Sequence, residues 1–141
     1  MKVKSIIKVG VPTANNRIYT MSDLCKMVDF IQPRVLQNKC FMWFGNIHPN
    51  EMTMDNIVGI VRNIEIVDGQ AYFDIDLIDG PNKEAIIELY NLNKLLVDFY
   101  LEAKTFVADE NGYSNVDLSE MAINGLSLKL VDDCVRVEEC V

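Results

Sequence analysis

Apolar and polar residues alternate with two different periods along this chain, and the early part of the sequence contains one example of each. Residues 2–9 alternate loosely and end at Gly10, which predicts a first strand followed by a loop. Beyond Thr20 and Ser22, either of which can cap a helix, apolar residues recur at helical spacing as far as Pro33, where we expect the helix to stop. These apolar positions are Leu24, Met27, Val28 and Ile31.

The middle of the chain predicts mainly strands. Residues 40–44 are a short, continuous apolar run typical of a buried strand. Two alternating runs follow, NIVGIVRNIEI and QAYFDIDLI, and Asp68-Gly69 between them is a strong signal for a β-hairpin.

Another helix and three more strands are predicted after the hairpin. Asn82 can cap a helix over KEAIIELYNLNKLL, whose apolar residues return at helical spacing. The remainder is typical of strands at about residues 97–107, 121–131 and 135–137, with a turn at DENGYSN. The expected fold is α+β and mainly β: a barrel-like antiparallel sheet with about two flanking helices, in one domain over residues 1–141.

Charge and composition narrow the classes of partner. The chain has 13 basic and 21 acidic residues, a net charge of −8, and no run of Lys or Arg with interleaved aromatics. Direct binding of nucleic acid is therefore not expected, because such binding requires cations that neutralise phosphates. The opening MKVKSIIKVG interrupts its apolar residues with lysines, so no membrane segment is expected there. An acidic surface suits solubility or a basic protein partner.

No metal or cofactor is expected. The four cysteines, Cys25, Cys40, Cys134 and Cys140, form no C-x-x-C pair, and one histidine cannot complete a zinc cluster with them. Reduced thiols are the simplest interpretation, with a disulfide between Cys134 and Cys140 left open.

The single histidine, His48 in FMWFGNIHP, is the candidate general base, because imidazole can activate a hydroxyl at neutral pH. Ser127 shares its strand face with Lys129, which is typical of a solvent-facing hydroxyl, although it is also a candidate nucleophile. Asp74 and Asp76 lie two apart on a strand and form a candidate carboxylate pair, or a solvated face. The other serines fit a strand, a helix start or turns: Ser5, Ser22, Ser114 and Ser119.

Two motifs in the first half of the chain resemble those of a known family. TANNRIYT, with Asn15, Arg17 and Tyr19, resembles the N-x-N-G-R-x-Y-P signature of the prohead proteases of tailed bacteriophages. WFGNIHP is similar to the G-x-x-G-H-P segment of these capsid-maturation serine peptidases, whose fold is similar to herpesvirus assemblin. The resemblance covers residues 9 to about 95, and it implies that His48 is the catalytic base.

The chain departs from the family where the nucleophile is expected. The family has a Ser-Ser-Arg-Gly type segment after the second helix, whereas this chain has LLVDFYLEAKTF, which places Asp98 and Phe99 in the nucleophile region. No serine or threonine follows until Thr105. The first motif also departs, with Asn16 in place of glycine and Thr20 in place of proline.

Three hypotheses follow, in order of preference. The first is a relative that has lost catalysis and acts by binding phage capsid, scaffold or protease proteins, as a homo-oligomer, in the host cytoplasm or the virion. The second is an active peptidase in which the match to the nucleophile segment is out of register, so that Ser127, Thr105 or a cysteine supplies the nucleophile. Loss of a nucleophile costs several powers of ten in rate, so a missing serine is not a minor variation. The third is a small phage or bacterial protein that sequesters a ligand or host factor in the former substrate cleft.

Overall fold

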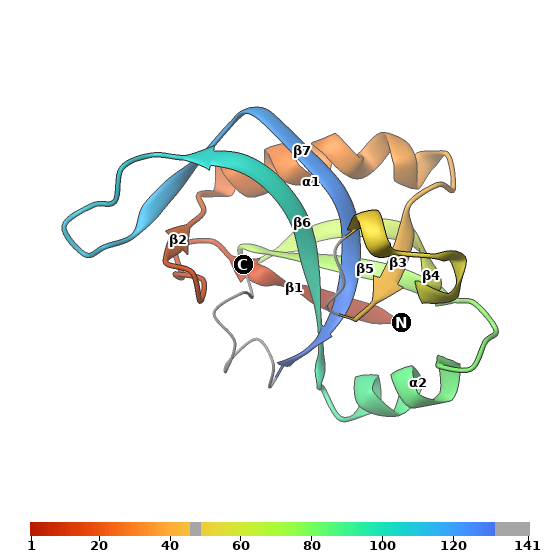
Figure 1. The fold of residues 1–141 in the computed structure, drawn as a ribbon. Helices are drawn as coiled ribbons and strands as arrows, with labels where there is room; N and C mark the ends of the chain where they lie inside the picture. Colours follow the sequence, from red (N-terminus) through yellow and green to blue (C-terminus); the bar gives the residue numbers. More distant parts are fainter. Residues whose placement is uncertain (46–48, 132–141) are drawn as a thin grey trace.

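Six strands close into a barrel in the computed structural model, which describes residues 1–45 and 49–131 (Figure 1). The neighbours run in the order β7-β3-β4-β5-β1-β6, and pairing of β6 with β7 completes the ring. The β1–β6 and β3–β7 ladders are parallel and the others antiparallel, so the barrel is mixed. The barrel strands are β1 (Lys2–Lys8), β3 (Phe41–Phe44), β4 (Ile57–Val67), β5 (Gln70–Leu77), β6 (Leu95–Thr105) and β7 (Ser114–Leu130).

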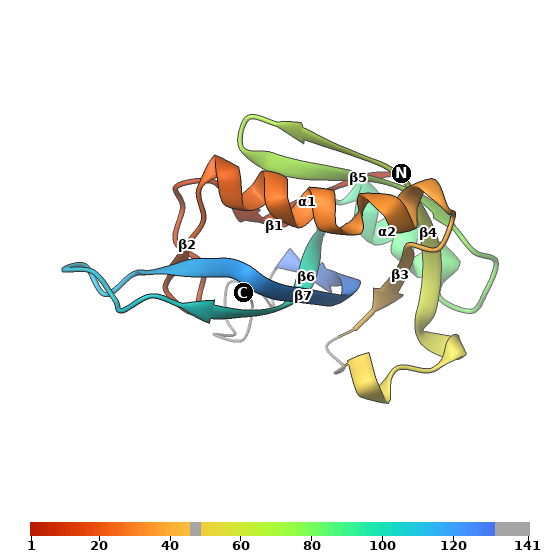
Figure 2. The ribbon, with the colours of Figure 1, turned by 90° about the horizontal axis from the view of Figure 1, so that it is seen from above.

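The prediction of a mainly β, barrel-like domain with two helices is confirmed. The expected antiparallel sheet is corrected to a mixed one, because the β1–β6 and β3–β7 ladders are parallel. A short strand, β2 (Arg17–Ile18), pairs with the start of β7 beside the barrel, and two 3-10 turns, Pro49–Glu51 and Met54–Asn56, precede β4. Figure 2 shows α1 lying across one side of the barrel. Helix α2 lies apart from α1, in the connection between β5 and β6.

Helix α1 (Met21–Leu36) begins where the sequence predicts and ends later. Thr20 forms a capping box with Asp23: the Asp23 amide donates to the Thr20 hydroxyl at 3.1 Å, and the Thr20 amide donates to the Asp23 carboxylate at 2.9 Å. The predicted stop at Pro33 is wrong. Pro33 lies in the last turn, where it costs few internal hydrogen bonds, and burial of Val35 against the core holds that turn.

The β4–β5 hairpin and helix α2 (Lys83–Asn91) follow the predicted order. Asp68 and Gly69 both have positive φ, 50° and 77°, as the tight turn requires. Asn82 occupies the N-cap position of α2, but its side chain makes no capping hydrogen bond, which corrects the predicted cap. The helix stops at Asn91, short of the predicted stretch, because the chain turns there through Asn93 with φ of 56°.

The last described strand is longer than predicted. β7 begins at Ser114 and not near Met121, and together with β6 it extends beyond the barrel as a two-stranded projection, hereafter the arm, residues 101–120 (Figures 1 and 2). The predicted strand at 135–137 lies outside the described residues. Inside the barrel, alternate residues of each strand meet in one core, where the rings of Phe73 and Phe99 pack edge to face at 5.5 Å.

Candidate functional site

A row of polar side chains crosses the outer face of the β6–β7 pair. Val97 and Phe99 are buried in the barrel core, so the residue between them, Asp98, faces the other way. Ser127 is directly opposite Asp98 in the antiparallel β6–β7 ladder, and Lys129 follows two residues later on the same face. The strands thus bring together the family-motif position Asp98 and the candidate nucleophile Ser127.

Asp98 and Lys129 form a buried ion pair. The Lys129 Nζ lies 2.5 Å from Oδ2 of Asp98, and the exposed fractions of the two side chains are 10% and 2%. Burial raises the pKa of the Asp98 carboxyl, and the Lys129 ammonium opposes that rise by its charge and its hydrogen bond. The other carboxylate oxygen, Oδ1, is buried and has no hydrogen-bond partner among the described residues. The carboxylate is therefore held by one strong contact.

Ser127 is buried, with an exposed fraction of 7%, so the interpretation as a solvent-facing hydroxyl is wrong. The outer face of this part of the barrel is covered. On its other side β7 pairs in parallel with β3, where Trp43 is the partner of Ser127. Trp43, Ser127 and Asp98 therefore occupy three adjacent strands at one level.

Strand β3 leads into the segment that contains His48. The Gly45 amide donates to the Leu128 carbonyl at 3.4 Å, so the chain leaves the barrel beside β7, one residue from Ser127 along that strand. The described chain resumes at Pro49. His48 itself lies outside the described residues, and its role as a base stays a prediction.

The first motif of the resemblance lies in the loop before α1 and in β2. The Thr13 hydroxyl donates to Oδ1 of Asn15 at 2.6 Å, and the Thr13 amide donates to the Arg17 carbonyl, which orders the loop. Tyr19 is buried, and its hydroxyl has no hydrogen-bond partner of ordinary geometry in the described parts of the chain. Burial raises the pKa of Tyr19; the Arg17 side chain lowers it, and the charge of Asp98 raises it further.

The other candidate nucleophiles within the described residues have structural environments that do not activate them. The Ser5 hydroxyl donates to the Ile7 carbonyl at 2.6 Å and accepts from the Ala71 amide at 3.2 Å, inside the barrel. Thr105 is exposed on the arm, where it pairs with Val116. Burial raises the pKa of the Cys40 thiol to about 11, which keeps it protonated at neutral pH. Ser22 lies in the first turn of α1, while Ser114 and Ser119 belong to β7.

The carboxylates of Asp74 and Asp76 do not act together. Asp74 lies 3.6 Å from the amino group of Met1, whereas Asp76 accepts a hydrogen bond from Nε of Arg62 at 2.8 Å. Within residues 1–45 and 49–131, no cluster of three or more His, Cys, Asp or Glu could hold a metal ion. The same part of the chain contains no helix with the length and apolar character needed to span a membrane.

A groove of about 660 Å³ lies elsewhere, between α2 and the β4–β5 wall. Apolar and polar side chains line it together, and its charged side chains are already paired: Arg62 with Asp76, and Lys83 with Asp79 at 2.6 Å. Asp98, Ser127 and Lys129 do not line this groove.

The architecture matches that of a known protein. The chain superimposes on the bacteriophage T4 capsid assembly protease, gp21, with a TM-score of 0.69, over 90% of this chain and 79% of that one. This chain has the fold of the T4 capsid assembly protease. The two sequences are 16% identical, so the likeness establishes the fold and not the activity. No protein-family model and no curated protein sequence matches the chain.

The resemblance of the two motifs to prohead proteases is therefore confirmed at the level of fold. The sequence interpretation missed Lys129 as a partner of Asp98. A signal for it was present, because each strand has one isolated charge within an apolar run, LLVDFYL and LSLKL, and the two charges are opposite.

Proposed function

We propose that this chain acts by binding in phage capsid assembly and does not hydrolyse peptide bonds. The observation that carries the proposal is the buried ion pair of Asp98 with Lys129 at the position on β6 where the resemblance places the nucleophile. A serine peptidase needs a hydroxyl there, activated by a neighbouring base. A carboxylate held by an ammonium group has neither the hydroxyl nor a proton to give to that base.

The ion pair also explains how the barrel stays stable with a carboxylate in place of a catalytic serine. An isolated charge in this position would be strongly destabilising, whereas a paired one is tolerated. The pair thus keeps β6 and β7 together on the face where the resemblance expects a catalytic group. We infer that the contacts which recognise assembly proteins are retained, with capsid, scaffold or protease proteins and further copies of the chain as partners, in the host cytoplasm or the virion.

A serine peptidase that uses Ser127 is the second candidate. Ser127 is opposite Asp98 and lies on the strand beside β3, which leads toward His48, so a hydroxyl is present close to the expected position. Sequestration of a small ligand has weaker support. The groove beside α2 is lined by apolar and polar side chains, but its charged groups are already engaged in ion pairs, Arg62 with Asp76 and Lys83 with Asp79.

Incubation of the purified chain with the capsid and scaffold proteins encoded in the same genome separates these functions. We expect co-elution with one of those proteins in size-exclusion chromatography, no cleavage of any of them, and no labelling by a fluorophosphonate probe for activated serines. Cleavage or labelling that Ser127→Ala and His48→Ala abolish, and Ser119→Ala does not, would establish the peptidase instead. Absence of both cleavage and co-elution would contradict both candidates.

A further inference from the structure

The arm, residues 101–120, extends away from the barrel and from α2 in both views of the fold (Figures 1 and 2). Backbone hydrogen bonds order its tip: the Phe106 amide donates to the Asn115 carbonyl at 2.9 Å, and the Asp109 amide donates to the Tyr113 carbonyl at 2.8 Å. On the side of β7, the Ser114 amide donates to the Asn16 carbonyl at 2.9 Å, beside β2. The Asp109 carboxylate also accepts hydrogen bonds from the amides of Asn111 and Tyr113. The arm is therefore a preformed element, and little ordering would be needed for it to bind a partner.

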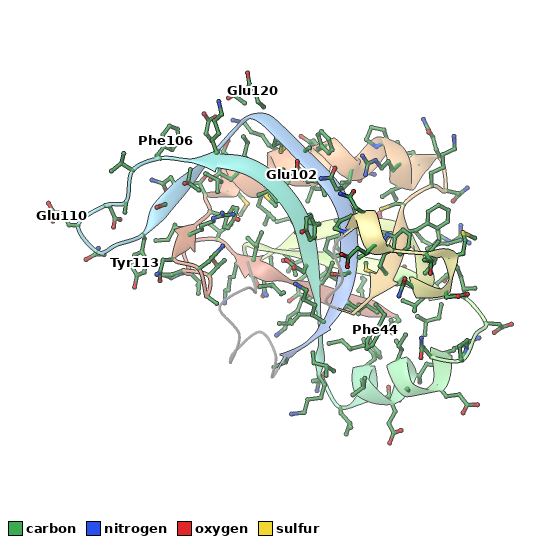
Figure 3. All side chains as sticks on the ribbon, viewed as in Figure 1. Phe44, Glu102, Phe106, Glu110, Tyr113 and Glu120 are labelled. Carbon is green, nitrogen blue, oxygen red and sulfur yellow. The ribbon has the colours of Figure 1, made fainter. Side chains whose placement is uncertain are left out.

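Two consecutive apolar side chains are exposed near the tip of the arm. The exposed fraction is 56% for Phe106 and 96% for Val107. Deeper along the same strand pair, Val116 and Leu118 are buried, so the inner part of the arm packs normally. Figure 3 shows Phe106 on one side of the arm and Tyr113 on the opposite side of its tip. Single exposed apolar residues are common, but an adjacent pair on a projecting, ordered hairpin is typical of a contact surface.

The charge of the arm is mainly negative. The arm contains one basic residue, Lys104, against five acidic ones: Glu102, Asp109, Glu110, Asp117 and Glu120. Its net charge of −4 is half of the −8 of the whole chain. Asp109 and Asp117 accept backbone hydrogen bonds, whereas the side chains of Glu102, Glu110 and Glu120 are exposed (Figure 3). The one ion pair on the arm, between Lys104 and Glu120 at 3.8 Å, is itself exposed and weak.

We propose that the arm is a docking surface for a basic protein partner, whose apolar side chains cover Phe106 and Val107 and whose Lys or Arg residues meet Glu102, Glu110 and Glu120. Charge complementarity favours this occupant over the alternatives. A second copy would bring two arms of like charge together, and nucleic acid would be repelled. Phe106 directly follows β6 and is eight positions from Asp98, about 25 Å by the rise of an extended strand, so the inference holds whether or not the chain cleaves peptides.

The test uses a fluorescent synthetic peptide of alternating leucine and lysine as the probe, with leucine–glutamate and serine–lysine peptides for comparison. Fluorescence anisotropy with the full chain measures the dissociation constant at low and high salt. We expect the leucine–lysine peptide to bind most tightly, and F106S/V107S to weaken it about tenfold or more, because burial of a Phe side chain contributes that much to affinity. The variant E102Q/E110Q/E120Q should also weaken binding and reduce its dependence on salt.

Matched controls remove similar groups from other surfaces. L36S/L92S removes two exposed apolar side chains from the ends of the helices, and E51Q/D55N/E84Q removes three exposed acidic groups away from the arm. Both controls should bind the leucine–lysine peptide as the unmodified chain does. Equal weakening by the controls, or equal affinity for the leucine–glutamate peptide, would overturn the proposal. Self-association in sedimentation velocity that F106S/V107S abolishes would assign the arm to a second copy instead.

Discussion

The Nζ of Lys129 lies 2.5 Å from the Oδ2 of Asp98, although the two residues are 31 positions apart in the chain. The contact is diagonal across the β6–β7 ladder, where Asp98 is opposite Ser127 and Lys129 is opposite Leu96. Both side chains are almost fully withdrawn from water, so the Asp98 carboxylate depends on the Lys129 ammonium for compensation of its charge. This pair links the stability of the barrel to the chemistry of the face that would hold a catalytic group.

Removal of one member of the pair should be costly. Lys129→Met leaves the Asp98 carboxylate buried without its cation, and we expect a loss of about 3–5 kcal/mol in the free energy of unfolding. Urea denaturation followed by the fluorescence of Trp43, the single tryptophan, measures it. The double variant Asp98→Leu/Lys129→Met should recover most of the loss, and Lys8→Met, at an exposed lysine, should cost little. A small effect of Lys129→Met would show that water or another group compensates Asp98.

The cost of Lys129→Met should depend on pH. Burial raises the pKa of Asp98 above its ordinary value of 3.8, and loss of the opposing Lys129 raises it further. In the window between 3.8 and the raised pKa, the folded variant binds a proton that the unfolded chain does not, so its stability falls as pH rises through that window. The difference from the unmodified chain should thus be largest near neutral pH and shrink toward pH 3.8. A difference that stays constant from acid to neutral pH would exclude Asp98 as its source.

Tyr19→Phe should be neutral or stabilising, by up to about 1 kcal/mol, because the buried Tyr19 hydroxyl has no hydrogen-bond partner of ordinary geometry within the described residues, and the Arg17 side chain that lowers its pKa makes no such bond. Burial also raises the pKa of Tyr19 above 10.0, so the unmodified chain should lose stability as pH rises above about 10, and Tyr19→Phe should lose less. Thermal denaturation across alkaline pH checks both effects. Tyr19→Ala is the control and should cost about 3–5 kcal/mol through the cavity it leaves. Marked destabilisation by Tyr19→Phe would reveal a partner for the hydroxyl.

Local signals in the sequence predicted the elements that local chemistry determines. The β4–β5 hairpin follows from Asp68-Gly69, because few residues other than these adopt two successive positive φ values easily. The start of α1 follows from the capping box of Thr20 and Asp23. Its end does not, because burial of Val35 decides whether the chain continues past Pro33, and burial is a property of the assembled barrel. The start of β7 was missed because DENGYSN was interpreted as a turn and the strand was placed after it only from residue 121, although Val116 and Leu118 alternate with polar residues and are buried.

The candidate site was only partly predictable for a related reason. The resemblance singled out Asp98, and strand alternation placed Ser127 and Lys129 on one face, but neither predicted which residues of β6 and β7 stand opposite one another. The register is irregular between Glu102 and Lys104, where the opposite strand advances from Ala122 to Asp117, so counting back from the turn would give the wrong partners. Burial of Ser127 follows from that arrangement and not from its neighbours in sequence.

Cys40 should resist alkylation in the folded protein, because burial raises the pKa of its thiol to about 11 and leaves roughly one thiolate in a thousand at pH 8. Cys25 is only partly buried and should react faster. Iodoacetamide treatment of a Cys134→Ser/Cys140→Ser background, with peptide mapping by mass spectrometry, measures the two rates separately. Cys40 should become reactive in denaturant, which controls for the reagent. Equal rates for Cys25 and Cys40 in the native chain would contradict the burial of Cys40.

Gly59→Ala should destabilise the barrel because β4 and β5 approach closely at Gly59. A Cβ at this position would lie 2.7 Å from Cγ2 of Ile75 and 2.8 Å from the backbone oxygen of Asp76, and the strand backbone cannot move aside as a flexible side chain can. We expect a loss of about 1–3 kcal/mol in urea denaturation, the usual cost of overpacking. Gly80→Ala is the matched control, since nothing lies within 4 Å of its added Cβ, and it should leave stability unchanged or slightly raised. Equal tolerance of both substitutions would mean that the β4–β5 register differs from the one described.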